Sequence, residues 1–283
     1  TYLRIEAKKV SDDGVNIKLN RKRNNMVVSE ANASYKRRFI NYPSKERYAF
    51  VEDEGEMLIV CHDKYMAAVQ PLVDWKNISG RPTTMVGMSE TGNNLKQYIQ
   101  NYYNEHPELV YLLLVGEYSD IPPYAMSGGK SDNYYGMLEG DDKYEEVLVG
   151  RLPVKSIGDA VNQVNKIIYY ERDIDASATW LTRASGVAAK EGEGHYGEID
   201  YEHMDFIRDT LLNYTYTEVS KYYENVNNPA APAMIVDYSK GLGLINYCNH
   251  GSPIGWNVAN FSVDDIHRLT NDNKWPIVWS VAC

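Results

Sequence analysis

The distribution of apolar and polar positions changes near residue 57 of the chain. Before that point the sequence is polar, basic and only weakly alternating, with strand-like patterns near residues 15–19 and 26–28. From Met57 onward, uninterrupted apolar runs alternate with stretches in which apolar residues recur every three or four positions. The runs are typical of buried strands and the periodic stretches of amphipathic helices. This alternation predicts parallel β-α-β units, and therefore an α/β fold in which helices cover both faces of a parallel sheet.

The apolar runs and the periodic stretches give the positions of the predicted elements. Strands are expected over residues 57–61, 83–88, 109–117, 146–153, 183–189, 218–223, 241–251 and 276–283. Helices are expected over 66–80, 93–106, 157–173, 201–213 and 231–240, with a further helical crossover over about 262–272. Ligands of such sheets bind beyond the carboxyl ends of the strands. Four chemically useful side chains follow predicted strands: Glu117, Glu191, His250 and Cys283.

Composition and charge narrow the class of protein. The 283 residues are enough for one large domain or two small ones, and 43% hydrophobic with 24% charged residues is ordinary for a globular chain. A net charge of −10 argues against a nucleic-acid partner. No apolar stretch approaches the roughly 20 residues of a membrane-spanning helix. The start, Thr1 to Arg4, lacks the pattern of a signal peptide, so we expect such a peptide to be absent or already removed.

The cysteines differ in their surroundings. There are three of them, an odd and sparse number that excludes a disulfide scaffold and leaves at least one thiol free. Cys61 and Cys248 lie within apolar runs, where a small buried hydrophobic residue is the ordinary interpretation. Cys283 instead comes at the end of an apolar run, beyond which no residue follows in the sequence. Its position is the one that calls for a chemical explanation.

His250 and Cys283 together have the composition of a thiol-based catalytic site. A cysteine nucleophile needs a neighbouring histidine to take its proton, because the thiolate is the reactive form. The tetrahedral intermediate also needs two N–H donors aimed at the developing oxyanion, and the backbone N–H groups of Gly251 and Cys283 are candidates. Either residue alone is more often structural. At the ends of neighbouring predicted strands, the two favour a base and its nucleophile.

Several motifs in one order extend this hypothesis to a family. They are NYCNHGS and PIVWSVAC, preceded by YLLLVGEYSDIP, KSDNYYG, GDDKYEEVLVGR and IIYYERD. With them the chain resembles, from about Met57 to Cys283, the gingipain family of bacterial cysteine peptidases, which have a caspase-like fold. The resemblance implies a secreted or cell-surface cysteine endopeptidase that cleaves proteins or peptides after basic residues, Arg preferred and Lys second. It implies no cofactor for catalysis.

The resemblance also assigns roles to individual residues. His250 matches the family's catalytic histidine, Cys283 its nucleophile and Glu191 the acid that orients the histidine. Asp200 matches the acid at the base of the S1 pocket in the arginine-specific members. Residues 1–47 resemble the tail of a prodomain, a partner of the enzyme itself, and 48–283 a catalytic domain whose second subdomain continues in the family beyond the nucleophile.

The acidic loop LEGDDKYEE, residues 138–146, is a candidate calcium site. Calcium prefers six to eight oxygen ligands. The side chains of Asp142 and Glu146, the carbonyls of Glu139 and Tyr144, and Glu117 from the preceding strand end could supply them. The composition alone is equally typical of a solvated acidic loop. The family binds calcium at the matching loop, so the resemblance implies a structural Ca²⁺ here.

Two alternatives stay open at the level of sequence. One is a caspase-like module that binds a partner without catalysis. The other is a peptidase of the same fold with a different P1 preference, as in the clostripain or legumain groups. A thiol-directed probe separates the first from an enzyme, and hydrolysis of peptides that vary at P1 separates the second.

Overall fold

A computed structural model of the chain describes residues 55–126, 129–140, 145–224, 226–227 and 229–282, and the backbone of 26–28 and 49–51. The chain divides into two compact units, Thr1–Glu171 and Arg172–Cys283. Strands β1 (Met26–Val28) and β2 (Ala49–Val51) pair in parallel. The predicted boundary between residues 47 and 48 and the predicted strand at 15–19 lie outside the described residues.

The first unit is built on a four-stranded parallel sheet with the order β4-β3-β5-β8. Its strands are β3 (Glu56–Cys61), β4 (Thr83–Gly87), β5 (Leu109–Val115) and β8 (Leu148–Leu152). Its helices are α2 (Met66–Ile78), α3 (Leu95–Glu105) and α4 (Ile157–Ile168), and a short hairpin pairs β6 (Tyr124–Met126) with β7 (Gly129–Ser131).

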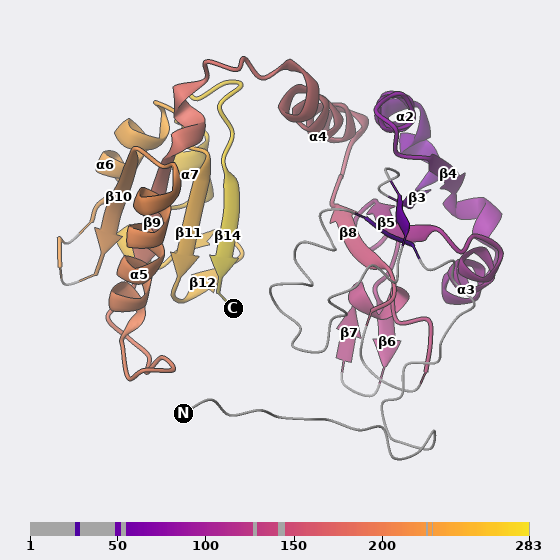
Figure 1. Cartoon of the computed structure of the whole chain (residues 1–283), viewed down its shortest axis with the longest axis horizontal. Coiled ribbons are helices and arrows are strands. Elements are labelled where there is room, and N and C mark those ends of the chain that lie inside the picture. Colours follow the sequence, from indigo (N-terminus) through magenta and orange to yellow (C-terminus); the bar gives the residue numbers. More distant parts are fainter. Residues whose placement is uncertain are drawn as a thin grey trace. The chain divides into compact units, whose positions relative to one another are not determined.

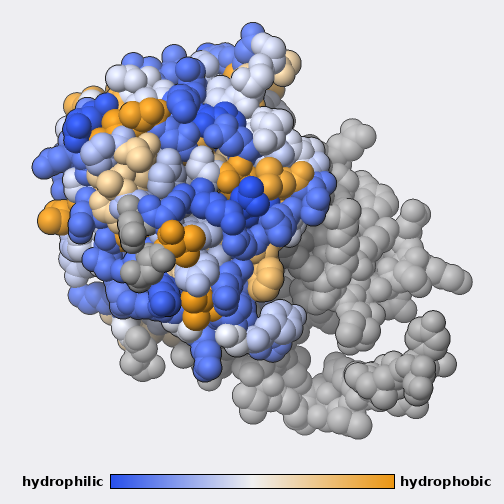
Figure 2. Space-filling view, turned by 90° about the vertical axis from the view of Figure 1, so that its left-hand side faces the viewer, coloured by the Kyte–Doolittle hydropathy of each residue, from blue (hydrophilic) through white to orange (hydrophobic). Residues whose placement is uncertain are grey.

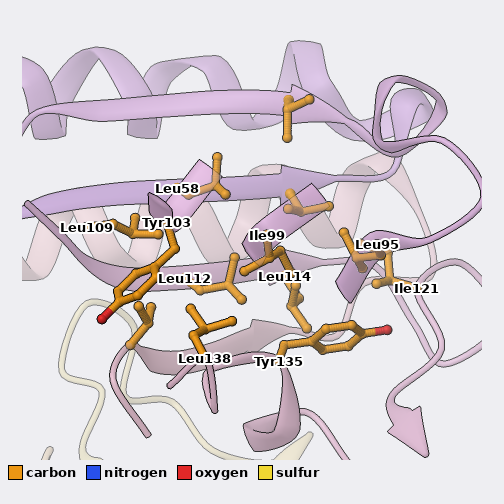
Figure 3. Packing of buried hydrophobic residues seen from close by; sticks show 13 residues of the cluster. Leu58, Leu95, Ile99, Tyr103, Leu109, Leu112, Leu114, Ile121, Tyr135 and Leu138 are labelled. Atoms are coloured by element: carbon orange, nitrogen blue, oxygen red, sulfur yellow. The ribbon is translucent and has the colours of Figure 1, made fainter. Parts of the chain in front are cut away.

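Side-chain alternation along the strands gives this sheet two cores. On one face, Leu58 and Leu112 pack with Ile99 and Tyr103 of α3 (Figure 3). On the other face, Ile59 and its neighbours pack against α2 and α4. Because both faces are buried, the strands read as continuous apolar runs, which is why the sequence predicted them well.

The second unit repeats this architecture with the order β10-β9-β11-β14. Its strands are β9 (Arg183–Ala188), β10 (Glu218–Tyr223), β11 (Leu244–Cys248) and β14 (Ile277–Val281), all parallel (Figure 1). Its helices are α5 (Asp200–Tyr214), α6 (Ala231–Tyr238) and the single turn α7 (Val263–Ile266). A two-residue hairpin, β12 (Gly251–Ser252) with β13 (Gly255–Trp256), follows β11.

The two faces of the second sheet carry different helices. Cys248 packs on one face with Ala188 and with Met204 of α5. Its neighbour Tyr247 points to the opposite face, in a cluster with Met234 of α6 and Phe261. Successive residues of a strand point to opposite faces, so β11 presents chemically distinct side chains to the two sides of the sheet.

Both sheets have the same strand order relative to the chain. In each, the second strand lies on one side of the first and the third strand on the other, so the connection reverses direction between β3 and β5, and again between β9 and β11. This reversal is the topological switch point at which open α/β sheets bind ligands. The predicted α/β fold with parallel strands and covering helices is confirmed, and each unit carries its own sheet.

Two predictions near the end of the chain need correction. The crossover expected over 262–272 is helical only over α7, because Ser262 and Asp265 form a capping box but turn-forming residues follow, with Asn273 at φ 61°. The apolar run at 276–283 is typical of a buried strand, yet all five residues of β14 are exposed. As the edge strand of its sheet, β14 is paired only with β11 among the described residues.

The surface in Figure 2 is predominantly hydrophilic, with apolar residues in small separate groups. Within the described ranges, no helix is long and apolar enough to cross a membrane.

Candidate active site

The strand order of the second unit places three predicted functional residues after adjacent strands. Cys248 at the end of β11 is in register with Ala188 of β9 on one side and Val281 of β14 on the other. Glu191 follows β9, His250 follows β11 and Cys283 follows β14. Cys283 itself lies outside the described residues. The topology nevertheless puts His250 between the segment that carries Glu191 and the strand that leads to Cys283.

His250 and Glu191 are in direct contact at the switch point. His250 Nε2 lies 2.9 Å from Glu191 Oε2, and the two side chains remain 63% and 55% exposed. A carboxylate at this distance holds the imidazole in one orientation. Because Nε2 faces Glu191, Nδ1 is the ring nitrogen left to exchange a proton with a reacting group.

The turn that carries His250 is anchored from below by Tyr247. The Tyr247 hydroxyl donates a hydrogen bond to the carbonyl of His250 and accepts one from the backbone N–H of Asn257 at 3.1 Å. The ring of Tyr247 is fully buried and stacks on Trp256 with 4.4 Å between centroids and 8° between planes. Because this buried phenol forms hydrogen bonds to two backbone segments, it fixes the position of the His250 backbone relative to the sheet.

Asn249 also holds the turn at His250 in place, although one of its polar atoms is left without a hydrogen bond. Its backbone N–H donates to the carbonyl of Val281 in β14 at 3.2 Å, and its side-chain oxygen accepts from the N–H of His250. Its Nδ2 is the single buried side-chain nitrogen or oxygen without a hydrogen-bond partner in the described part of the chain. A donor left unpaired costs about 1–3 kcal/mol. The turn at His250 therefore holds its conformation against a local penalty, as functional turns often do.

Asp200 adjoins the same pair. It is the first residue of α5, and its backbone N–H donates to the carbonyl of Glu191 at 2.9 Å. Its carboxylate accepts a weak hydrogen bond from the Cys248 thiol, with Sγ 3.6 Å from Oδ1. Burial raises the pKa of Asp200, and the charge of Glu191 raises it further. Asp200 is therefore a half-buried carboxylate, and the only basic side chains among the described residues that lower its pKa are histidines.

Glycine at position 192 permits this close approach. Its φ of +80° is in the left-handed region, and a Cβ placed there would come 2.9 Å from Asp200 Oδ1. Gly251, the other glycine of interest, lies directly after His250 as the first residue of β12. Its role as a backbone N–H donor to the oxyanion stays a prediction.

Neither described cysteine is an activated thiol. Burial, followed by the charge of Asp63, raises the pKa of Cys61 to about 12, and its side chain is fully buried. Burial also raises the pKa of Cys248, with a further contribution from Asp200. Cys61 is the core residue that the sequence predicted. Cys248, predicted as a buried hydrophobic residue, is instead half-buried against Asp200.

The predicted calcium ligands are separate in the described part of the chain. Glu139 accepts from Tyr103 Oη at 2.7 Å, and Glu146 accepts from the N–H groups of Leu138 and Glu139. Glu117 pairs with Lys155, 3.3 Å from Nζ to Oε1. Asp142 and Tyr144 lie outside the described residues. The described ranges contain no group of three or more metal-binding side chains, so these glutamates by themselves do not form a calcium site.

A lysine ammonium binds backbone carbonyl oxygens of the segment just before this loop. Lys96 Nζ donates to the carbonyls of Tyr134, Tyr135 and Met137 at 2.5 to 3.3 Å. Burial lowers the pKa of Lys96 to about 8. The ammonium of Lys96 therefore holds the segment that leads into the acidic loop.

Sequence reasoning missed Tyr247 and the contact of Cys248 with Asp200. Both lie in the apolar run 241–251, where their side chains read as core. The one available signal was the alternation along that run, which places Tyr247 and Cys248 on opposite faces just before His250. It does not reveal what lies against either face.

Known proteins resemble this chain over most of its length. It is 35% identical to Gingipain R1 of Porphyromonas gingivalis over the whole chain and 29% of that protein. It is 36% identical to Gingipain R2 over 88% of the chain and 35% of that protein. Lys-gingipain HG66 of the same organism is 25% identical over 80% of the chain and 14% of that protein. The chain thus spans about a third or less of these relatives.

Two solved structures share the fold. One is the crystal structure of the Arg specific cysteine proteinase gingipain R, and the other is the complex of the pro- and mature domains of Porphyromonas gingivalis RgpB. Each has a TM-score of 0.76 and 34% identity over 81% of this chain, and 54% and 56% of the respective solved chains are covered. The resemblance drawn from the motifs and the caspase-like fold are confirmed. Residues 51–283 match the family model described as Peptidase family C25, so the chain belongs to peptidase family C25, the family of the gingipains.

Proposed function

We propose that this chain carries the catalytic site of a secreted cysteine endopeptidase that cleaves after basic residues, Arg preferred and Lys second. The observation that carries the proposal is the His250–Glu191 pair at the switch point of the second sheet, next to the strand that leads to Cys283. The relative whose solved structure is titled Arg specific is 34% identical to the chain, and Lys-gingipain HG66 is 25% identical. Their names support the order of preference.

The reaction follows from the positions of these groups. His250 takes the thiol proton of Cys283, and the thiolate attacks the carbonyl carbon of the scissile bond. The oxyanion that forms is stabilised by the backbone N–H groups of Gly251 and Cys283. When the carbon–nitrogen bond breaks, the imidazolium gives its proton to the leaving amine. Water, deprotonated by His250, then hydrolyses the thioester and releases the carboxylic acid and the thiol.

Cys283 is the thiol that this chemistry favours. The two described cysteines have raised pKa values, so they are poor nucleophiles near neutral pH. Cys283 follows β14 in the sequence, and we propose that its thiol meets the imidazole of His250, whose protonated form would stabilise the thiolate.

Asp200 is the proposed determinant of the preference for a basic P1 residue. Its half-buried carboxylate lies on the α5 side of His250, and within the described residues it pairs with no lysine or arginine. An arginine side chain that enters there supplies a cationic partner, with a planar group that can form two parallel hydrogen bonds. Lysine supplies a single ammonium and is therefore the second choice.

A panel of quenched peptides that differ only at P1 tests the proposed function. Arg, Lys, Asn, Asp and Leu at P1 cover the proposal and the alternative preferences of related folds. We expect hydrolysis only of the Arg and Lys peptides, with Arg faster, and loss of hydrolysis in Cys283→Ala. Hydrolysis after Asn or Leu would overturn the specificity, and an inactive protein would favour a binding module.

We also propose that residues 1–47 are the tail of a prodomain, and that maturation cuts after Arg47 or Arg38. A solved complex of pro- and mature domains of a relative supports this. Both sites follow basic clusters, so a peptidase that cleaves after Arg can process itself or a related molecule. N-terminal sequencing of the mature enzyme tests it, and a start well inside residues 57–280 would contradict it.

A structural calcium at residues 138–146 stays a prediction. It would need Asp142 and Tyr144 in addition to the glutamates, which are already bonded within the protein. A ligand bound only by the folded state raises its stability by mass action. Thermal melting with and without excess chelator measures this stabilisation. The same melting temperature in both conditions would contradict the calcium site.

A further inference from the structure

A pocket of about 500 Å³ lies beside His250, on the opposite side of the sheet from Asp200. Its wall is formed by His250 itself, the β12–β13 hairpin and the segment up to Ser262. Figure 1 shows β12 at the carboxyl end of β11 and β14. The volume is within the range of about 300–1,000 Å³ typical of ligand pockets. The proposed role of Asp200 does not use this space.

The two sides of His250 correspond to the two faces of the sheet. Asp200 contacts Cys248, whose side chain is on the face covered by α5. Trp256 and Phe261, which line the pocket, pack with Tyr247 on the face covered by α6. A peptide bound across the end of β11 therefore meets a carboxylate on one side of His250 and the pocket on the other.

The walls of the pocket are mainly aromatic and aliphatic. Trp256 stacks one ring face on Tyr247, Phe261 lies 6.0 Å from Trp256 between ring centroids, and Ile254 is 72% exposed at the rim. The remaining lining groups are glycines and the small polar residues Ser and Asn, and the only titratable lining residue is His250. Such a lining favours a large neutral side chain over a charged one.

The pocket is formed in advance by backbone hydrogen bonds. The N–H of Trp256 donates to the carbonyl of Phe261 at 2.8 Å, and the N–H of Val263 donates to that of Ile254 at 3.0 Å. A Cβ on Gly255 would come 2.7 Å from the carbonyl oxygen of Phe261, so only glycine permits this contact. Ala259 and Asn260 nearby have φ values of 63° and 50°, a left-handed conformation that is costly for alanine. A wall maintained at that cost is rigid.

The general-acid step of the proposed mechanism indicates which residue of the substrate lies next to the pocket. In the proposed mechanism the imidazolium of His250 protonates the amine that leaves, so the ring must lie next to the leaving side of the scissile bond. The pocket is lined by His250 on the side away from Asp200. The residue that donates the leaving amine is therefore the one whose side chain comes closest to it.

We propose that this pocket is the binding site for the P1′ side chain, the residue directly after the scissile bond, and that it selects large apolar side chains such as Leu and Phe. The inference rests on the proposed endopeptidase function and adds to it. The enzyme then recognises a basic residue followed by an apolar one, with Asp200 reading the first and the pocket reading the second.

Quenched peptides with Arg fixed at P1 and Leu, Phe, Gly, Asp or Lys at P1′ test this subsite. We expect kcat/KM to be at least about tenfold higher for Leu and Phe than for Gly, and lowest for the charged residues. Ile254 is suited to mutation because it is exposed and its loss leaves the core intact. Ile254→Asp should lower the Leu to Gly ratio of kcat/KM at least about fivefold and raise the relative rate of the P1′ Lys peptide. Ile254→Lys should instead favour the P1′ Asp peptide, a gain that misfolding cannot produce.

The controls separate this inference from the proposed function. Ile78→Asp changes an isoleucine of α2 in the first unit that is 80% exposed, and it should leave every P1′ ratio at the wild-type value. Alkylation by a peptidyl-arginine chloromethyl ketone, which has no P1′ residue, reports the catalytic thiol alone. Alkylation with equal kcat/KM for all P1′ residues would overturn the subsite and leave the peptidase intact. A dependence on P2 that Ile254→Asp changes would place the pocket on the acyl side and also overturn it.

Discussion

The two units share one strand order but use its switch point differently. In the first unit, His62 follows β3 and its Nε2 lies 3.8 Å from Asp120 Oδ1, near the end of β5. In the second, His250 follows β11 and lies 2.9 Å from Glu191, which follows β9. Each switch point therefore carries a histidine beside a carboxylate. The two pairs are alike in composition, but the histidine follows the first strand of its sheet at one switch point and the third strand at the other.

The carboxylates have different partners. Asp120 has 11% of its side chain exposed and also accepts from Lys64 Nζ at 2.7 Å and from the Tyr65 hydroxyl at 3.4 Å. The hydrogen bond from Lys64 is the main reason that the pKa of Asp120 is lowered. Glu191 is 55% exposed beside an exposed His250, and the neighbouring Asp200 has a raised pKa.

The two sheet edges differ in how their charged side chains are paired. At the first edge, Arg151 forms two 2.6 Å hydrogen bonds to Asp132 and donates to the carbonyls of Gly116 and Ile121. At the second edge, the acidic groups and the imidazole are left accessible and incompletely paired. A sheet edge that satisfies its own charges stabilises the fold, whereas one that leaves them open can bind and react.

Replacement of each histidine by asparagine should break this comparison most strongly. His250→Asn removes the proposed general base and acid, and kcat/KM should fall by about 10³ or more. His62→Asn is the control from the other switch point, where the histidine follows β3, the first strand of its sheet, and it should stay within about twofold of wild type. Steady-state hydrolysis of a P1 Arg peptide measures both. Equal losses in the two variants would remove the functional distinction between the edges.

Replacement of one aspartate at each edge should separate specificity from stability. Asp200→Asn should lower kcat/KM for Arg peptides by two or more orders of magnitude, the effect of about 3 kcal/mol for loss of a charged partner. Asp132→Asn should leave kcat/KM unchanged and lower the melting temperature, because Arg151 loses its ionic partner. Calorimetry and peptide kinetics on both proteins provide the readouts. Wild-type rates in Asp200→Asn would make Asp200 a surface acid of α5.

Tyr247→Phe should reveal whether His250 is held by the phenol beneath it. The ring keeps its stacking on Trp256 but loses its hydrogen bonds to His250 and Asn257. We expect kcat to fall about tenfold with little change in KM, because misplacement affects the reaction more than binding. Tyr238→Phe removes a buried hydrogen bond to Ser185, 3.0 Å away, on the same face and is the control. A similar decrease of kcat in both variants would indicate a merely structural role.

The smallest effect concerns pH. The raised pKa of Asp200 means that it takes up a proton at higher pH than an ordinary aspartate, so its charge is lost first as the pH falls. The ratio of kcat/KM for an Arg peptide over its neutral citrulline counterpart should therefore decrease on acidification. An ionisation that affects both peptides equally cancels in the ratio. Asp200→Asn should make the ratio independent of pH, and a wild-type ratio that is already constant would exclude this role.

The sequence predicted those parts of the molecule whose residues repeat with a fixed period. The buried strand at Leu109–Val115 and the helix at Ile157–Ile168 were recognisable because both faces of one and one face of the other are apolar. Positions of His250 and Glu191 after parallel strands followed from the same alternation, since such strand ends share an edge. Their direct contact needed the strand order, which periodicity does not contain.

Features that depend on long-range packing escaped the sequence. Cys248 reads as core, but its contact with Asp200 depends on where α5 begins relative to β11, 48 residues away in the chain. The helix α7 and the strand β14 were predicted, but α7 is shorter than expected and β14 is exposed, because an apolar run shows that a strand can be buried and does not show that anything covers it. The calcium site predicted at the acidic loop stays a prediction, since Asp142 and Tyr144 lie outside the described residues.

The central claim is that His250 activates Cys283, and the most direct measurement is which cysteine a substrate-like alkylating agent modifies. A peptidyl-arginine chloromethyl ketone is added to the wild-type enzyme and to His250→Asn, and the modified residue is located by peptide mass spectrometry. Cys283 should be alkylated stoichiometrically in wild type and at least about 10² times more slowly in His250→Asn, with Cys61 and Cys248 unmodified in both. Modification of Cys248, or alkylation of Cys283 at the same rate in both proteins, would contradict the account.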